Sequence, residues 1–135
     1  GSIMAHFAEL DKDNKVLRVV VGSNTDIANN GGEQSTQAAT HFATVVPLSA
    51  NGVKWVQTSY NHNFRKQYAG TGDTYDETND RFLKSKPGAA WTYNADGDLV
   101  PPMPMPSDDK IYIWDEDAYQ ADNTTGWVVL PNQPE

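Results

Sequence analysis

The sequence predicts a mainly β fold of the α+β type, built from short antiparallel hairpins with one helix near residues 33–46. Three observations support this prediction. Apolar runs are short, aromatic residues recur beside them, and turns rich in Asp, Asn and Gly separate them. Such turn residues bond to nearby backbone or tolerate positive φ, so they reverse the chain readily.

The first predicted hairpin covers residues 6–22, with a polar turn at 11–15 followed by a run rich in β-branched residues, which favour strands. Residues 23–32 are polar and are expected to form a loop. The one predicted helix, which Pro47 ends, has apolar residues close to a 3.6-residue spacing: Ala38, Ala39, Phe42, Val45 and Val46.

Residues 54–82 are expected to be the stretch against which the N-terminal and C-terminal hairpins pack. A short strand at 54–58 follows the turn signal Asn51-Gly52, and 61–69 is either one helical turn or an ordered loop. Each aromatic ring buries a large area, so the core of this stretch depends on its rings: Trp55, Tyr60, Phe64, Tyr68, Tyr75 and Phe82.

Three further hairpins are predicted at 74–83, 90–100 and 111–129, the last around an acidic loop at 115–125. Between the second and third lie four prolines within residues 101–106, which force an extended path that cannot join a central strand. This segment is expected to be a linker or an arm.

The predicted organisation is a single domain, as expected for 135 residues, and the alternative is two small lobes joined by the Pro/Met-rich arm. An aromatic hairpin domain with one helix covers 4–100, a Pro/Met-rich linker or arm covers 101–110, and a C-terminal hairpin at 111–130 packs on the same domain. Residues 1–3 are expected to be a cloning remnant, with Met4 as the native start and no signal peptide. Residues 131–135 are expected to be disordered.

The net charge of −8 argues against nucleic-acid binding, which needs clustered Lys and Arg to displace counterions from phosphates. It argues equally against binding to an anionic membrane surface, and no apolar run is long enough to span a bilayer. The chain has no Cys, which excludes disulfides, thiolate nucleophiles and Cys-ligated zinc.

No catalytic residue, cofactor or metal site is predicted. His6, His41 and His62 lie in separate segments without a metal-ligand spacing. The densest carboxylate cluster lies in 115–122; a solvated hairpin turn accounts for it, and calcium binding there is left open. Paired carboxylates for glycoside hydrolysis need a set separation that sequence does not supply.

Two segments are candidate interfaces. In the first, two basic residues lie among aromatic side chains, a combination typical of interaction hot spots: Tyr60, Phe64, Arg65, Lys66 and Tyr68. The alternative is that the rings belong to the core and Arg65 pairs with a nearby Asp. The second is the arm carrying Met103 and Met105, because Met adapts to irregular surfaces and a pre-extended chain loses little entropy on docking.

The segment Met4-Ala5-His6-Phe7-Ala8-Glu9-Leu10-Asp11 resembles the start of a family of small proteins from marine tailed bacteriophages, especially cyanophage-like viruses. The resemblance continues through residues 54–61, 63–66, 68–70 and 74–76 and returns at 111–116. The aromatic hairpins and Pro-rich connector are also similar to tail-fibre and tail-accessory modules. The family brings no catalytic residues that transfer to this chain.

We therefore expect a non-enzymatic phage protein, virion-associated at the tail or a tail fibre, or assisting virion assembly through protein–protein contacts. Its partners would be other virion proteins, with homo-oligomerisation possible. One alternative is a host-takeover protein that binds a bacterial protein in the host cytoplasm, which the acidic charge fits. Another is a hydrolase acting on cell-surface polysaccharide.

Overall fold

A computed structural model describes residues 4–130, and the fold is mainly β, as predicted. The chain divides into two compact units, Gly1–Ser85 and Lys86–Glu135, called here the N-terminal and C-terminal units. The predictions for residues 1–3 and 131–135 lie outside the described residues. Within residues 4–130, no helix is both long and apolar enough to cross a membrane.

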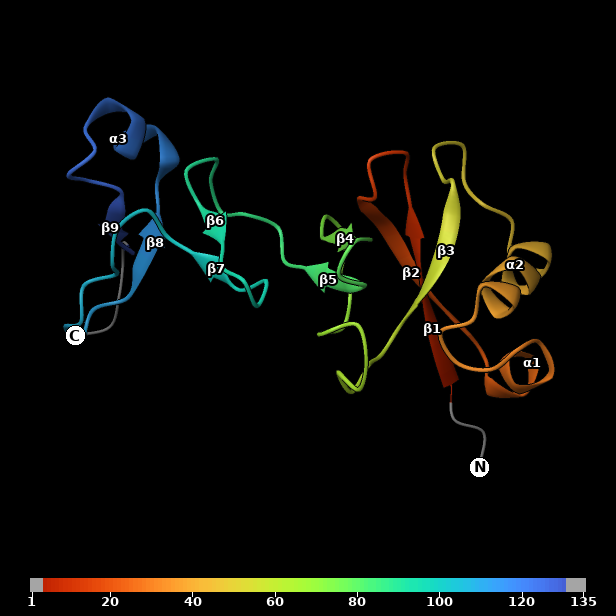
Figure 1. The fold of residues 1–135 in the computed structure, drawn as a ribbon. Helices are drawn as coiled ribbons and strands as arrows, with labels where there is room; N and C mark the ends of the chain where they lie inside the picture. The colour runs from red at the N-terminus through yellow and green to blue at the C-terminus, as the bar shows by residue number, and fades with distance from the viewer. Residues whose placement is uncertain (1–3, 131–135) are drawn as a thin grey trace. The chain divides into compact units, whose positions relative to one another are not determined.

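The N-terminal unit is built on a three-stranded antiparallel sheet of β1 (Met4–Leu10), β2 (Val16–Ser23) and β3 (Lys54–Thr58), in the order β2-β1-β3 (Figure 1). The predicted hairpin of β1 and β2 is confirmed. Asp11 sets its turn, because its Oδ1 accepts hydrogen bonds from the amides of Asp13 and Lys15. Among the described strands, β3 pairs only with β1 and is therefore an edge strand.

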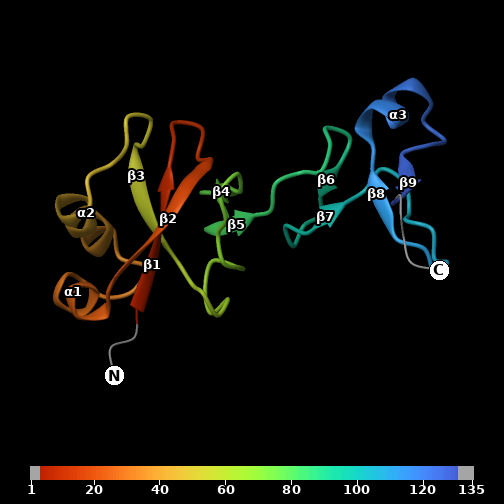
Figure 2. The same ribbon diagram turned by 180° about the vertical axis from the view of Figure 1, so that it is seen from behind.

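Two helices, α1 (Asn24–Asn29) and α2 (Thr36–Val45), cover one face of this sheet (Figures 1 and 2). Helix α2 lies within the predicted range and begins at Ser35, whose side chain accepts a hydrogen bond from the Ala38 amide at 3.0 Å. The prediction of a loop over 23–32 is wrong, because burial of Ile27 supports α1. The core on this face consists of Ala5, Phe7, Ile27, Ala38, Phe42 and Trp55.

The opposite face of the sheet is covered by the hairpin of β4 (Thr74–Asp76) and β5 (Arg81–Leu83), as predicted (Figures 1 and 2). Residues 61–69 contain no helix and form an ordered loop, one of the two predicted alternatives. Residues 54–82 therefore supply the surface against which the N-terminal hairpin packs, and packing of the C-terminal hairpins on them stays a prediction. The core on this face consists of Ala8, Leu10, Val16, Val56, Ala69, Tyr75 and Phe82.

The C-terminal unit contains two short hairpins, as predicted. Its elements are β6 (Thr92–Tyr93), β7 (Leu99–Val100), β8 (Tyr112–Trp114), α3 (Glu116–Ala121) and β9 (Trp127–Val129). The prediction of an acidic loop over 115–125 is wrong in part, because α3 occupies its first half. Asp115 caps α3 by accepting a hydrogen bond from the Ala118 amide at 3.0 Å.

Three tryptophans form the centre of the C-terminal unit. Trp91, Trp114 and Trp127 meet edge to face, with ring centroids 5.1–5.8 Å apart. The Trp127 indole also donates to the Met103 carbonyl at 2.9 Å, which ties the Pro/Met-rich segment to this cluster. Residues 86–100 thus belong to the same unit as the C-terminal hairpin. The boundary between the two units lies after Ser85, before the 101–110 segment that was predicted to be a linker or an arm.

Candidate functional site

An open groove of about 470 Å³ runs along the free edge of β3 in the N-terminal unit. Helix α2 forms one wall and the β4–β5 hairpin with Arg65 forms the other, so the edge strand lies at the bottom between two layers. We call it the β3 groove, and its lining residues are Gln34, Ser35, Thr36, Ala39, Thr40, Ala43, Leu48, Val53, Lys54, Trp55, Val56, Gln57, Arg65, Tyr75 and Glu77.

The bottom of the β3 groove presents unpaired backbone groups. The Gln57 carbonyl points away from β1, because it accepts a hydrogen bond from Arg65 Nη1 at 3.0 Å. Backbone groups alternate between the two sides of a strand, so the amide and carbonyl of Trp55 and the amide of Gln57 point the same way. Within the described part of the chain, none of these three groups has a hydrogen-bond partner. Trp55 and Gln57 are only 3% and 4% exposed, so a partner would reach these backbone groups from within the groove.

The α2 wall is made of small side chains. The groove-lining residues of the helix fall at i, i+3, i+4 and i+7, which places them on one stripe: Thr36, Ala39, Thr40 and Ala43. A neighbouring stripe, Ala38 and Phe42, is buried in the core. Because Ala and Thr side chains are short, the helix packs on the sheet through Phe42 and still leaves space beside β3.

The opposite wall carries a charged pair. Lys54 Nζ lies 3.0 Å from Glu77 Oε1, and both side chains are substantially exposed. Such exposed pairs contribute little to stability. Hydrogen bonding and the charge of Lys54 lower the pKa of Glu77. Glu77 is the one carboxylate among the groove-lining residues, and this pairing keeps it ionised and turned toward Lys54.

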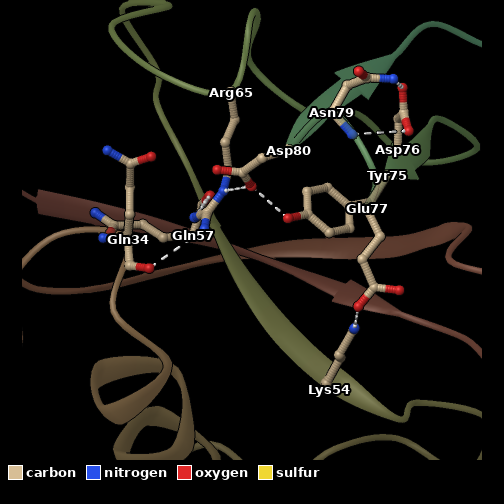
Figure 3. A network of polar contacts seen from close by, with 9 residues as sticks. All are labelled: Gln34, Lys54, Gln57, Arg65, Tyr75, Asp76, Glu77, Asn79 and Asp80. Carbon is tan, nitrogen blue, oxygen red and sulfur yellow. Dashed lines mark hydrogen bonds and ion pairs between the residues drawn. The ribbon is translucent and has the colours of Figure 1, made fainter.

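Arg65 closes one end of the β3 groove (Figure 3). Its guanidinium donates to Asp80 Oδ1 at 2.7 Å, to the Gln57 carbonyl at 3.0 Å and to the Gln34 carbonyl at 3.3 Å. These acceptors come from the hairpin, from β3 and from the segment before α2. Arg65 therefore joins three segments that are distant in sequence, and we call this arrangement the Arg65 clamp.

Tyr75 extends the Arg65 clamp into the core. Its hydroxyl donates a short hydrogen bond to Asp80, and the Arg65 guanidinium lies 5.9 Å from the centroid of its ring. Burial and the bond to Asp80 raise the pKa of Tyr75 to about 12. Burial acts to raise the pKa of Asp80, but the hydrogen bonds from Arg65 and Tyr75 outweigh it and the net shift is downward. Tyr75 is therefore a neutral phenol that donates to the ionised carboxylate of Asp80.

The backbone around the Arg65 clamp adopts unfavourable conformations. Gln34, Arg65 and Asp80 have φ values of 62°, 52° and 51°, in the left-handed region that non-Gly residues rarely occupy. Such residues cost of order 1–3 kcal/mol each and persist where surrounding contacts hold them; they also concentrate at functional sites. All three belong to the Arg65 clamp, and three further described non-Gly residues with positive φ, Asn14, His62 and Lys66, lie outside it.

A second, smaller depression of about 80 Å³ lies beside the C-terminal end of β3, the end at which Arg65 bonds to Gln57. His6 and Tyr60 line it, their rings stack at 5.6 Å, and Tyr68 meets both edge on. Tyr60 is 64% exposed. Of the predicted interface, the structure therefore brings Tyr60 and Tyr68 together around His6, a residue that the sequence did not connect with them.

The other predicted interface residues are placed differently. The Arg65 side chain is only 11% exposed and is engaged in the Arg65 clamp, which agrees with the alternative that it pairs with an Asp. Phe64 and Lys66 are half-buried, and Phe64 lines the smaller depression. In the C-terminal unit, Met103 is half-buried and Met105 is 56% exposed.

Sequence reasoning missed the β3 groove itself. Its floor is a strand edge, and which strand is an edge depends on pairings between distant segments. Its α2 wall carried a readable signal, since Thr36, Ala39, Thr40 and Ala43 form a stripe of small residues. The apolar stripe predicted from the sequence includes Ala39 but not the other three residues.

The acidic side chains at 115–122 have local roles. Asp122 accepts hydrogen bonds from the amide and hydroxyl of Thr124, and Glu116 accepts from the Trp114 indole at 3.0 Å. Among the described residues, no three His, Cys, Asp or Glu side chains are grouped so that they could hold a metal ion.

Comparison of the chain with protein-family models, with curated proteins and with solved structures gave no match.

Proposed function

We propose that this chain is a non-enzymatic binding module that contacts another protein through the β3 groove. The observation that carries the proposal is the open backbone edge at Trp55, held between two walls. Exposed strand edges are sites at which other polypeptides pair. The charged side chains of the groove are already paired, Lys54 with Glu77 and Arg65 with Asp80.

The resemblance to phage proteins directs the proposal toward a virion. A tail or tail-fibre accessory protein, or one that assists assembly, acts by holding other proteins, and an open strand edge serves that purpose. We infer that the partner is another virion protein. The strong acidic charge favours solubility in the uncomplexed state and also fits the second candidate, a takeover protein bound to a basic host surface.

The hydrolase alternative receives less support from the β3 groove. Glycoside hydrolysis ordinarily uses two carboxyl groups that face each other across the scissile bond. Of the described residues that line the β3 groove, one is a carboxylate, Glu77, and Lys54 pairs with it. The rest of the lining combines amides, hydroxyls and apolar side chains with the cations Lys54 and Arg65, which suits contact with a polypeptide.

Two variants of α2 test the proposal. Thr40→Trp fills the β3 groove from an exposed position, whereas Gln37→Trp places the same ring on an exposed position outside the groove. We expect mass spectrometry to find the chain in purified virions of the phage that encodes it. Immobilised wild-type protein and Gln37→Trp should retain the same virion protein, and Thr40→Trp should lose it. Absence from virions, with retention of a host protein instead, would favour the takeover candidate.

A further inference from the structure

We infer that the β3 groove takes an extended segment of a partner polypeptide as a fourth strand of the sheet, paired with β3 at Trp55. This inference rests on the proposed binding function and adds how the partner is held. The bound species is a single extended segment whose side chains alternate between apolar and polar.

The backbone groups at the bottom of the groove define the pairing. Trp55 offers one donor and one acceptor on the free side of β3, and Gln57 offers one further donor. An adjacent strand would lie about 4.8 Å away and present matching groups at the same spacing. Arg65 already occupies the Gln57 carbonyl, so the Arg65 clamp marks the end of the available edge.

The two walls leave room for a single extended chain but not for the edge strand of another folded sheet. Helix α2 lies on one side of the β3 edge and the β4–β5 hairpin lies on the other, so a second sheet with its own layers would collide with them. Lysine often protects a strand edge by projecting across it. Here Lys54 is bound to Glu77 on the hairpin side, which leaves the edge at Trp55 accessible to one chain.

The faces of the sheet predict the side-chain pattern of the segment. The residue opposite Trp55 points toward the α2 side, where Ala39, Ala43 and Leu48 leave room for an apolar side chain. Its two neighbours point toward the hairpin side. There the Lys54–Glu77 pair favours a polar or charged side chain. The segment should therefore read polar, apolar, polar around one anchor residue.

The test uses random twelve-residue peptides, selected on the full-length chain alone. The selected peptides should bind wild type and Gln37→Trp equally, and Thr40→Trp at least tenfold more weakly. Thermal unfolding of both variants verifies that they are folded. Each peptide is then remade with single N-methyl groups, which remove one backbone donor without changing the side chain. Methylation of one residue should weaken binding at least tenfold, and methylation of its two neighbours less than threefold.

The possible failures are distinguishable. If no selected peptide is sensitive to Thr40→Trp, both the inference and the proposed function are overturned. If peptides are sensitive to Thr40→Trp but tolerate every N-methyl group, the groove binds peptides through side chains, and only strand addition is overturned. If the chain alone sediments as a dimer that Thr40→Trp dissociates, the occupant is a second copy and the inferred partner is wrong.

Discussion

Replacing Arg65 tests whether the Arg65 clamp holds the N-terminal unit together. In Arg65→Met, two carbonyls lose a charged donor, at about 1.5 kcal/mol each, and the pair with half-exposed Asp80 adds at most about 1 kcal/mol. The expected loss in the free energy of unfolding is therefore about 3–4 kcal/mol. Arg65→Lys keeps the charge, but one ammonium cannot reach acceptors on three segments, so about 2 kcal/mol should still be lost.

Urea unfolding followed by far-ultraviolet circular dichroism measures these losses. With a slope of about 2 kcal/mol per molar urea, Arg65→Met should lower the midpoint for the N-terminal unit by about 1.5–2 M. Hydrogen exchange of the amides in β3 and β5 assigns the loss to this unit. Lys12→Met, at an exposed position in the first turn, is the control and should change stability by less than about 0.5 kcal/mol. A loss equally small for Arg65→Met would refute the clamp.

Three further predictions concern stability. The pKa of Tyr75 is raised from 10 to about 12, so its contribution of about 2–3 kcal/mol is present below pH 10 and is lost as the pH rises to 12; urea unfolding should show a smaller fall for Tyr75→Phe than for wild type, and equal falls would contradict the assignment. Burial acts to raise the pKa of Glu9, but bonds from Arg18 and Ser49 lower it overall, so its contribution is present above its ordinary pKa and is lost as the pH falls through the lower folded value. Glu9→Gln should cost about 2 kcal/mol at neutral pH and less in acid, and an equal cost at both would contradict the assignment. Gly126→Ala should lower the melting temperature of the C-terminal unit by several degrees, because its φ is 143° and a Cβ would lie 2.5 Å from the Trp114 ring; an unchanged melting temperature would exclude that contact.

The sequence by itself determined the local reversals and the apolar faces of the elements. The Asp11 turn, the hairpins at 74–83 and 111–129 and the helix within 33–46 all follow from residues a few positions apart. The two short helices escaped prediction, because six residues are too few for a periodic signal. Helix α1 depends on burial of Ile27, and α3 depends on capping by Asp115.

The tertiary structure alone decided which of these pieces meet. The order β2-β1-β3 makes β3 an edge, and that order depends on pairing across more than forty residues of chain. The same long-range packing decided between the two predicted roles of Arg65 in favour of pairing with an Asp, and it grouped Trp91 with Trp114 and Trp127 in the C-terminal unit. Local patterns specify how a strand or turn forms. Whether its free edge faces solvent or another strand depends on contacts between segments that sequence spacing does not encode.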